Sequence, residues 1–247
     1  MKVYRYSPKA TVKWQPLAKG LYFTSCLTQC LFLSSARILT AGTDGHTVVW
    51  PLTSETTRLS AGSADPAKSP LTLSWQQPLR IQQSSSKVMA SHDLDKSSKL
   101  VVSGGDDGSL AVLLLGRTWS TPSLDTAYAV PPVLLSRVHA SAVTACTVLK
   151  YNHRIFILTS GNDQWIRLWE VTVRDGGGVT LPLTSIYGED IVAVSRRGKM
   201  KTNVADVSSM AVLEVKEEGS EARVLICGVG MEVVRVEWHG HEGHLSV

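Results

Sequence analysis

Two groups of residues in this 247-residue sequence could bind a metal ion. Asp106 and Asp107 are adjacent carboxylates, and His239, His241 and His244 are imidazoles near the carboxyl end. Carboxylate oxygens and imidazole nitrogens are common metal ligands. However, the aspartates stand in a turn-like Gly-Asp-Asp-Gly segment, and the histidines stand in a Gly-rich terminal tail, where disorder is common. We therefore expect no metal site.

The Gly-Val-Gly-Met-Glu segment at 228–232 has glycines spaced as in a turn that binds a methyl-donor cofactor. Such a site requires a strand, a turn and then a helix. Here Val233, Val234 and Val236 follow, and β-branched residues favour a strand. The sequence also contains no Ser-His-Asp order, HExxH or phosphate-binding loop. We therefore expect no catalytic residues, no cofactor, no small-molecule substrate and no enzymatic activity.

A basic cluster and one tryptophan are the candidate contacts for a macromolecular partner. Arg196, Arg197, Lys199 and Lys201 give four positive charges in six residues, which we expect in a loop. They could hold RNA phosphates or could simply be solvated. Trp165 occupies a turn position where small residues are usual. It could anchor a protein partner, since tryptophan is frequent in binding hot spots, or pack locally.

One short fragment occurs three times, which indicates a repeat architecture. Each copy begins with Ser or Thr, has Asp four residues later, and has Trp or Leu six residues after the Asp. The aspartates are 63 and 56 residues apart. The three copies are Thr40, Asp44 and Trp50; Ser103, Asp107 and Leu113; and Thr159, Asp163 and Trp169.

Short apolar segments separated by turn residues surround each copy. The turn of the first copy contains Asp44-Gly45, and Asp-Gly between apolar runs is a strong hairpin signal. Amphipathic patterns long enough for a stable helix are missing. Regularly spaced short strands with turn signals predict an all-β fold.

The three copies resemble WD repeats, each of which forms one four-stranded blade of a β-propeller. His139 stands 24 residues before Asp163, at the spacing of the histidine in the family's pattern. The resemblance implies a buried network in which Asp163 holds His139, His139 holds Thr159, and Thr159 holds the indole N–H of Trp169. At the same spacing the first copy has Gly20 and the second has Gln83 nearby. A weaker fourth copy at 225–233 lacks the aspartate.

We expect a partial WD-repeat β-propeller of about four blades. An incomplete segment at 1–24 would precede blades near 25–80, 81–132, 133–190 and 200–238, and a flexible tail would occupy 239–247. WD propellers usually carry more blades, and a partial ring exposes unpaired edges. We therefore expect the carboxy-terminal part of a longer protein, or a ring that another chain completes.

Composition adds only broad limits. The net charge of +4 is mild for a dedicated nucleic-acid-binding domain. The four cysteines include no Cys-x-x-Cys pair, so neither a zinc site nor a disulfide framework is indicated. The amino terminus lacks a signal-peptide core, and no apolar stretch reaches the ~18 residues that span a bilayer. We expect a cytoplasmic protein without membrane insertion.

Longer stretches resemble the carboxy-terminal part of the WD-repeat protein six family, over roughly residues 25–238. They are 38–52, 103–110, 139–144, 204–207, 227–233 and the closing Trp238. The resemblance implies a non-catalytic adaptor for a methyltransferase protein subunit that methylates the ribose 2′-oxygen of the wobble nucleotide in tRNA anticodons, with tRNA contacted through the complex. The alternative is a general protein-interaction scaffold without an RNA role, in endosomal recycling or ubiquitin-ligase assembly.

Overall fold

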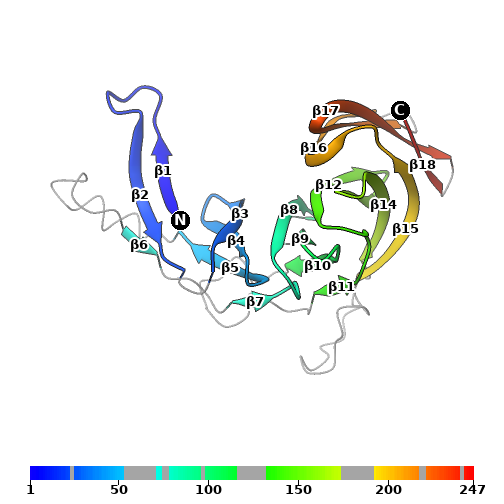
Figure 1. Cartoon of the computed structure of the whole chain (residues 1–247). Helices are drawn as coiled ribbons and strands as arrows, with labels where there is room; N and C mark the ends of the chain where they lie inside the picture. Colours follow the sequence, from blue (N-terminus) through cyan, green and yellow to red (C-terminus); the bar gives the residue numbers. More distant parts are fainter. Residues whose placement is uncertain are drawn as a thin grey trace.

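The computed structural model contains only β-strands as regular secondary structure in the residues that it describes, which are 1–22, 25–52, 71–73, 78–95, 98–115, 132–173, 192–216, 221–239 and 242–247. The strands form five antiparallel or mixed sheets. Figure 1 shows the sheets side by side along an open arc, with the amino-terminal sheet at one end and the carboxy-terminal sheet at the other. Within this part of the chain no helix is long and apolar enough to cross a membrane.

The first two sheets come from the amino-terminal third of the chain. The amino-terminal sheet consists of β1 (Lys2–Tyr6), β2 (Trp14–Gly20) and β6 (Leu71–Leu73). Strands β1 and β2 form a hairpin, and β6 lies parallel to β2. Blade 1 consists of β3 (Leu27–Ser34), β4 (Arg37–Gly42), β5 (His46–Pro51) and β7 (Leu79–Arg80).

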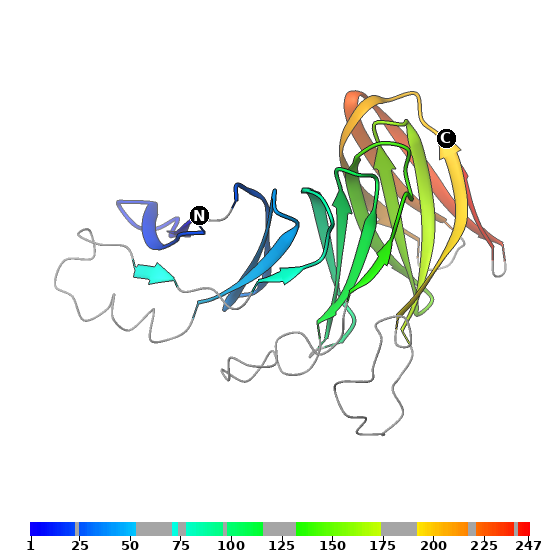
Figure 2. The same cartoon turned by 60° about the horizontal axis from the view of Figure 1, so that its bottom comes forward.

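The other three sheets follow in chain order, and Figure 2 shows their strands more nearly side-on. Blade 2 consists of β8 (Ser86–Asp93), β9 (Lys99–Gly105), β10 (Leu110–Leu115) and β11 (Val133–Leu135). Blade 3 consists of β12 (Val143–Tyr151), β13 (Arg154–Gly161), β14 (Trp165–Val173) and β15 (Val192–Lys201). Blade 4 consists of β16 (Ala205–Val215), β17 (Glu221–His239) and β18 (Glu242–Ser246).

Neighbouring sheets pack face to face, so the central strands are apolar on both sides. In β4, Ile38 belongs to the core shared with the amino-terminal sheet, and the next residue, Leu39, to the core shared with blade 2. Successive side chains of a strand point to opposite faces, which explains this division. The same logic places Phe156 of β13 against blade 4 and Ile157 against blade 2. Strands buried on both faces therefore read as continuous hydrophobic runs.

Three sequence predictions differ from this architecture. The basic cluster lies in strand β15 and not in a loop, because β15 pairs with β14 along its whole length. Blade 3 consequently ends at Lys201 and not near residue 190. The tail expected to be flexible contains β18, whose residues 242–246 pair with residues 235–239 of β17. The local sequence does not distinguish these edge strands from loops, because both carry charged and short polar residues.

Candidate interaction surface and blade networks

The four residues of the expected blade network lie in contact in blade 3. His139 Nδ1 is 2.9 Å from Asp163 Oδ1, and His139 Nε2 is 2.9 Å from Thr159 Oγ1. The indole N–H of Trp169 donates to Thr159 Oγ1 at 2.9 Å. One proton arrangement satisfies these four side chains: Thr159 donates to Nε2, and Nδ1–H donates to Asp163. The network ties the loop before β12 to strands β13 and β14.

Asp163 accepts several further hydrogen bonds. The amides of Ala140 and Trp165 lie 3.0 and 3.1 Å from its oxygens, and Arg167 lies 3.0 Å away. Burial alone would raise the pKa of Asp163, but the hydrogen bonds from His139, Ala140, Trp165 and Arg167 outweigh it and lower the pKa to about 2. Asp163 is therefore a fixed anion at neutral pH.

His139 is neutral in this setting. Burial of the ring lowers its pKa, and the nearby Arg167 guanidinium lowers it further, while the bond to Asp163 works in the opposite direction. The imidazole has no solvent-exposed surface, and only 8% of the Asp163 side chain is exposed. This enclosed His–Asp pair has almost no contact with solvent, and its hydrogen bonds connect the loop before β12 to β13 and to the turn before β14.

Blade 1 builds a related network without a histidine. Trp50 donates its indole N–H to Thr40 Oγ1 at 2.8 Å, as Trp169 does in blade 3. Asp44 accepts a hydrogen bond from the hydroxyl of Tyr22 at 2.8 Å. Gly20, at the histidine spacing, lies against the Trp50 ring, which occupies the space that a larger side chain would need. Tyr22 was not predicted from the sequence, although it lies only two residues from the expected position.

Blade 2 uses an amide and hydroxyl groups. The buried Gln82 donates to the Ser103 carbonyl at 2.7 Å and accepts from Ser109 Oγ at 2.6 Å. Ser109 also donates its backbone N–H to Asp107 Oδ1 at 3.0 Å. Gln83, which stands near the histidine position in the sequence, is exposed, and its neighbour Gln82 makes these contacts. Leu113 fills the tryptophan position as a buried apolar residue.

Blade 4 contains a carboxylate contact that no sequence motif predicts. Glu232 accepts hydrogen bonds from the hydroxyl of the buried Thr202 and, at 3.2 Å, from the amide of Asn203. These two donors lie in the connection between β15 and β16. A carboxylate thus ties a connecting loop to blade 4, much as Asp163 does in blade 3. The glycine-rich segment around Glu232 lies within β17, so it is not the strand-turn-helix site of a cofactor.

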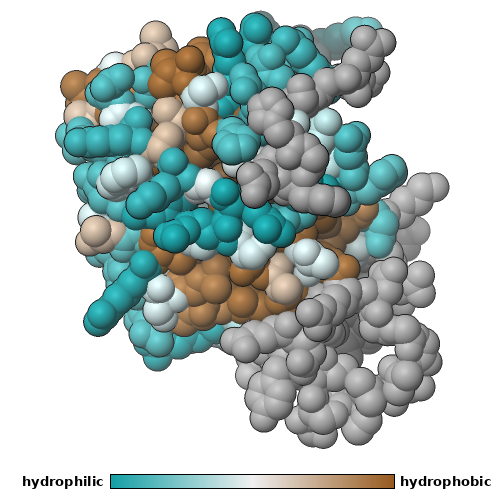
Figure 3. Space-filling view, turned by 90° about the vertical axis from the view of Figure 1, so that its right-hand side faces the viewer, coloured by the Kyte–Doolittle hydropathy of each residue, from teal (hydrophilic) through white to brown (hydrophobic). Residues whose placement is uncertain are grey.

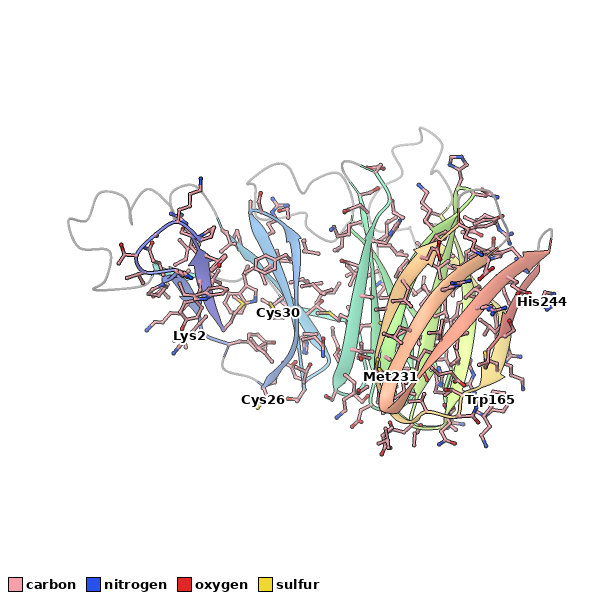
Figure 4. All side chains as sticks on the ribbon, turned by 90° about the horizontal axis from the view of Figure 1, so that it is seen from above. Lys2, Cys26, Cys30, Trp165, Met231 and His244 are labelled. Carbon is pink, nitrogen blue, oxygen red and sulfur yellow. The ribbon has the colours of Figure 1, made fainter. Side chains whose placement is uncertain are left out.

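Three of the five candidate partner contacts, Trp165, Lys199 and Lys201, lie together on the outer part of blade 3. Trp165 pairs with Lys201 and Arg167 pairs with Lys199 across β14 and β15, so these four side chains share a face. The Lys199 ammonium lies 4.9 Å from the centroid of the Trp165 ring, within cation–π range. We call Trp165, Arg167, Lys199 and Lys201 the blade 3 basic face. Figure 4 shows Trp165 at the same end of the sheets as Met231.

Of the two arginines of the basic cluster, only Arg197 lies apart from that face, because Arg196 pairs with Trp169 and so points to the same side of the sheet as Lys199. Arg197 is the extra residue of a β-bulge opposite Leu168 and Trp169, and its Nε donates to Glu170 Oε2 at 2.6 Å. Glu170 also accepts a bond of 2.6 Å from Arg154 Nε. The hydrogen bond from Arg154 is the main cause of the lowered Glu170 pKa, and Arg197 adds to it. Arg196 is exposed and pairs with Trp169 in the backbone register.

The structure also places most of the residues that were considered and rejected as metal ligands. Asp107 sits in the tight turn bound to Ser109, whereas Asp106 is half exposed and lies 3.5 Å from Lys87. His244 is exposed on β18, while His241 and the side chain of His239 lie outside the described residues. In the part of the chain that the structure describes, no three His, Cys, Asp or Glu residues are grouped as metal ligands would be.

Comparison with known proteins gives a match of fold only. No protein-family model and no curated protein matches the chain. The chain is similar to the WD40 domain of SCAP from fission yeast, with a TM-score of 0.52 and 11% identity over 92% of this chain and 45% of that one. It also matches the computationally designed Ika4 protein, with a TM-score of 0.49 and 17% identity over 89% of this chain and 96% of that one.

The likeness to the SCAP domain confirms the predicted fold class, an all-β, partial β-propeller of WD type. The chain spans less than half of that domain. At such low identity only the arrangement of strands carries over.

Proposed function

We propose that this chain is a non-catalytic, cytoplasmic WD-repeat adaptor that assists a tRNA ribose 2′-O-methyltransferase at the anticodon wobble position. The methyltransferase subunit would supply the methyl donor site and the catalytic residues. The observation that carries the proposal is the difference between the buried and the exposed charged groups of blade 3. Its His–Asp pair is buried in the blade network, whereas its outer strand presents lysines to solvent.

The hydrogen-bond networks of the blades support a role as a rigid scaffold. A network in which each polar group has a partner specifies one arrangement of the loops that connect the blades. Loops and strand ends on such a scaffold hold binding residues in fixed positions. An adaptor needs this property, because it must hold the enzyme and the substrate in a constant relative orientation.

The blade 3 basic face supports contact with an anionic partner. Lys199 and Lys201 are exposed, and no described carboxylate forms an ion pair with either. Their charges are therefore available for phosphates, which dominate the affinity of proteins for nucleic acids. Trp165, which is partly exposed, adds a ring on which a base or a side chain can stack.

Mass spectrometry of tRNA tests the proposal. In cells that lack the gene, we expect loss of 2′-O-methylation at the wobble ribose with other modifications intact. Re-expression of the chain should restore it, and a chain with Lys199→Glu and Lys201→Glu should restore less than the Lys150→Glu control, whose lysine is exposed on β12. Unchanged methylation in the deletion strain would refute the adaptor role.

A second candidate function is a protein-interaction scaffold without an RNA role, in endosomal recycling or ubiquitin-ligase assembly. Blade 4 favours it, because Leu213, Val229 and Met231 are more than half exposed at the end of the arc. Figure 3 shows an apolar patch, bordered by hydrophilic side chains, on the side of the molecule where blades 3 and 4 end the arc. Such patches often mark protein interfaces. Stable protein partners together with unchanged tRNA methylation would favour this function.

A further inference from the structure

The amino-terminal hairpin has an unusual charge pattern. Its residues 1–20 contain Lys2, Arg5, Lys9, Lys13 and Lys19 and no Asp or Glu, and the first acidic residue of the chain is Asp44. All five basic residues are exposed, and within the described residues no carboxylate pairs with any of them. Figure 1 shows this hairpin standing at the free end of the arc, and Figure 4 places Lys2 there. The hairpin is therefore a positively charged projection.

The strand register sorts the hairpin into two different faces. Val3 pairs with Ala18, and both are buried in the core shared with blade 1. Tyr4 pairs with Pro16, Tyr6 with Trp14, and Lys2 with Lys19. Directly paired residues point to the same side of a sheet, so these three pairs form the opposite, outer face. We call this set of six residues the aromatic ladder.

The aromatic rings of the ladder are open to solvent. Tyr4, Tyr6 and Trp14 are 49%, 52% and 62% exposed. The centroids of Tyr6 and Trp14 are 4.6 Å apart with the rings inclined by 39°, so they form one surface and not two isolated side chains. Lys9 and Lys13 in the hairpin loop stand at one end of the ladder, and Lys2 and Lys19 stand at the other.

The charges decide what can cover this face. Another apolar blade would bury Lys2 and Lys19, which face one another with like charge, without a partner. An anionic ligand would instead neutralise them. Aromatic rings between positive charges are the combination that binds single-stranded nucleic acid, in which bases stack on rings and phosphates contact lysines. A double helix hides its bases and could use only the charges.

We propose that the aromatic ladder binds single-stranded RNA, with bases stacked on Tyr4, Tyr6 and Trp14 and phosphates held by the lysines at both ends. The choice of RNA over DNA rests on the proposed role in tRNA methylation. The ladder lies on a different sheet from the blade 3 basic face, so it constitutes a separate contact. Together the two surfaces would hold an RNA at two places on the arc.

The test uses the purified full chain and labelled single-stranded RNA of about 12 nucleotides, with binding followed by fluorescence anisotropy between about 50 and 200 mM salt. We expect Trp14→Ala and Tyr6→Ala each to weaken binding at least ~5-fold, as loss of one stacked base would. The double variant Lys9→Glu and Lys13→Glu should weaken binding and flatten its salt dependence. Phe32→Ala and Lys150→Glu change an exposed ring and an exposed charge elsewhere, and should leave affinity within about twofold.

Several results would overturn the inference. They are equal affinity of the ladder variants and the wild type, equal binding of duplex and single strands, preference for single-stranded DNA over RNA, or a concentration-dependent dimer that Trp14→Ala abolishes. The last result would assign the ladder to a protein contact. Because no methyltransferase is present, the assay can succeed or fail separately from the proposed function. Loss of RNA binding in Trp14→Ala without a methylation defect in the deletion strain would support the ladder and refute the adaptor role.

Discussion

The Tyr22 hydroxyl lies 2.8 Å from Asp44 Oδ2, so a phenol in blade 1 does what the His139 imidazole does for Asp163 in blade 3. Both side chains come from the segment before the first strand of their blade and reach the turn that joins its second and third strands. The donor is a phenol in blade 1 and an imidazole in blade 3, but in both blades it connects the preceding segment to the turn. A carboxylate in that turn needs a donor from the preceding segment, and more than one residue type can supply it.

Removal of the Tyr22 hydroxyl should weaken blade 1. Tyr22→Phe keeps the ring and deletes one hydrogen bond to a carboxylate, so we expect a loss of roughly 1 to 2 kcal/mol in the free energy of unfolding. Urea denaturation measures this loss. Tyr4→Phe is the matched control, because no described residue bonds to its exposed hydroxyl, and it should shift the midpoint very little. Equal midpoints for the two variants would show that the Asp44 contact contributes nothing.

Gly20→Ala should destabilise the contact between the amino-terminal sheet and blade 1. A Cβ at Gly20 would stand 2.4 Å from the Trp50 ring, whose side chain is fully buried. Overpacking of this kind costs about 1 to 3 kcal/mol. The melting temperature should therefore fall. Gly230→Ala is a control for backbone strain without a clash. At Gly230 φ is 109°, but an added Cβ meets no atom within 4 Å. A melting temperature that does not fall in Gly20→Ala would contradict the packing argument.

Asp163→Ala should destabilise blade 3 by about 1 to 3 kcal/mol. The substitution leaves the buried Nδ1–H of His139 and the amides of Ala140 and Trp165 without an acceptor. Chemical denaturation of the purified chain gives the difference. Asp106→Ala removes an exposed neighbouring carboxylate, which forms a 3.5 Å ion pair with Lys87, so it should change stability by less than about 0.5 kcal/mol. An unchanged midpoint in Asp163→Ala would refute the network.

The same carboxylate makes stability depend on acid pH. The pKa of Asp163 is lowered to about 2 in the folded chain, below its ordinary value of 3.8. A carboxyl group whose pKa is lower in the folded than in the unfolded chain stabilises the fold. This contribution is complete above the unfolded-state pKa and is lost as pH falls toward about 2. The full contribution is roughly 2 kcal/mol. Unfolding free energies measured between about pH 6 and pH 3 should fall less steeply for Asp163→Asn than for the wild type, and parallel curves would contradict the assignment.

The repeated Asp turns made most of the blade architecture predictable from the sequence. Local signals sufficed there, since Asp44, Asp107 and Asp163 each precede an apolar strand and form a tight turn. The histidine substitutes were not predictable in the same way. Tyr22 and Gln82 match the WD-repeat histidine neither in residue type nor in spacing. Only the folded path of the chain brings their polar atoms to their hydrogen-bond partners.

The outer surfaces were the least predictable part. Periodicity in β15 is obscured by the bulge at Arg197, which shifts the alternation, so that Arg196 and not Arg197 shares a face with Lys199. The aromatic ladder was missed for a related reason. Tyr4, Tyr6 and Trp14 are distributed over two strands, and only the hairpin register shows that they share a face. Long-range pairing, which local sequence does not encode, decides such surfaces.

If the chain assists a tRNA methyltransferase as proposed, the blade 3 basic face should contribute salt-sensitive binding of tRNA by that proposed complex. Lys199→Glu and Lys201→Glu each replace a positive charge by a negative one on the edge strand. Each lysine that neutralises a phosphate contributes about 0.7 to 0.9 to the slope of log affinity against log salt, so the double variant should flatten that slope by about 1 to 2. Affinity measured in a salt titration, with the chain and the methyltransferase together, gives the slope. Arg197→Glu removes a cation already paired with Glu170, so it should lower stability and change the slope less. An equal slope for the wild type and the lysine variant would mean that these two residues face solvent or a protein surface in the complex.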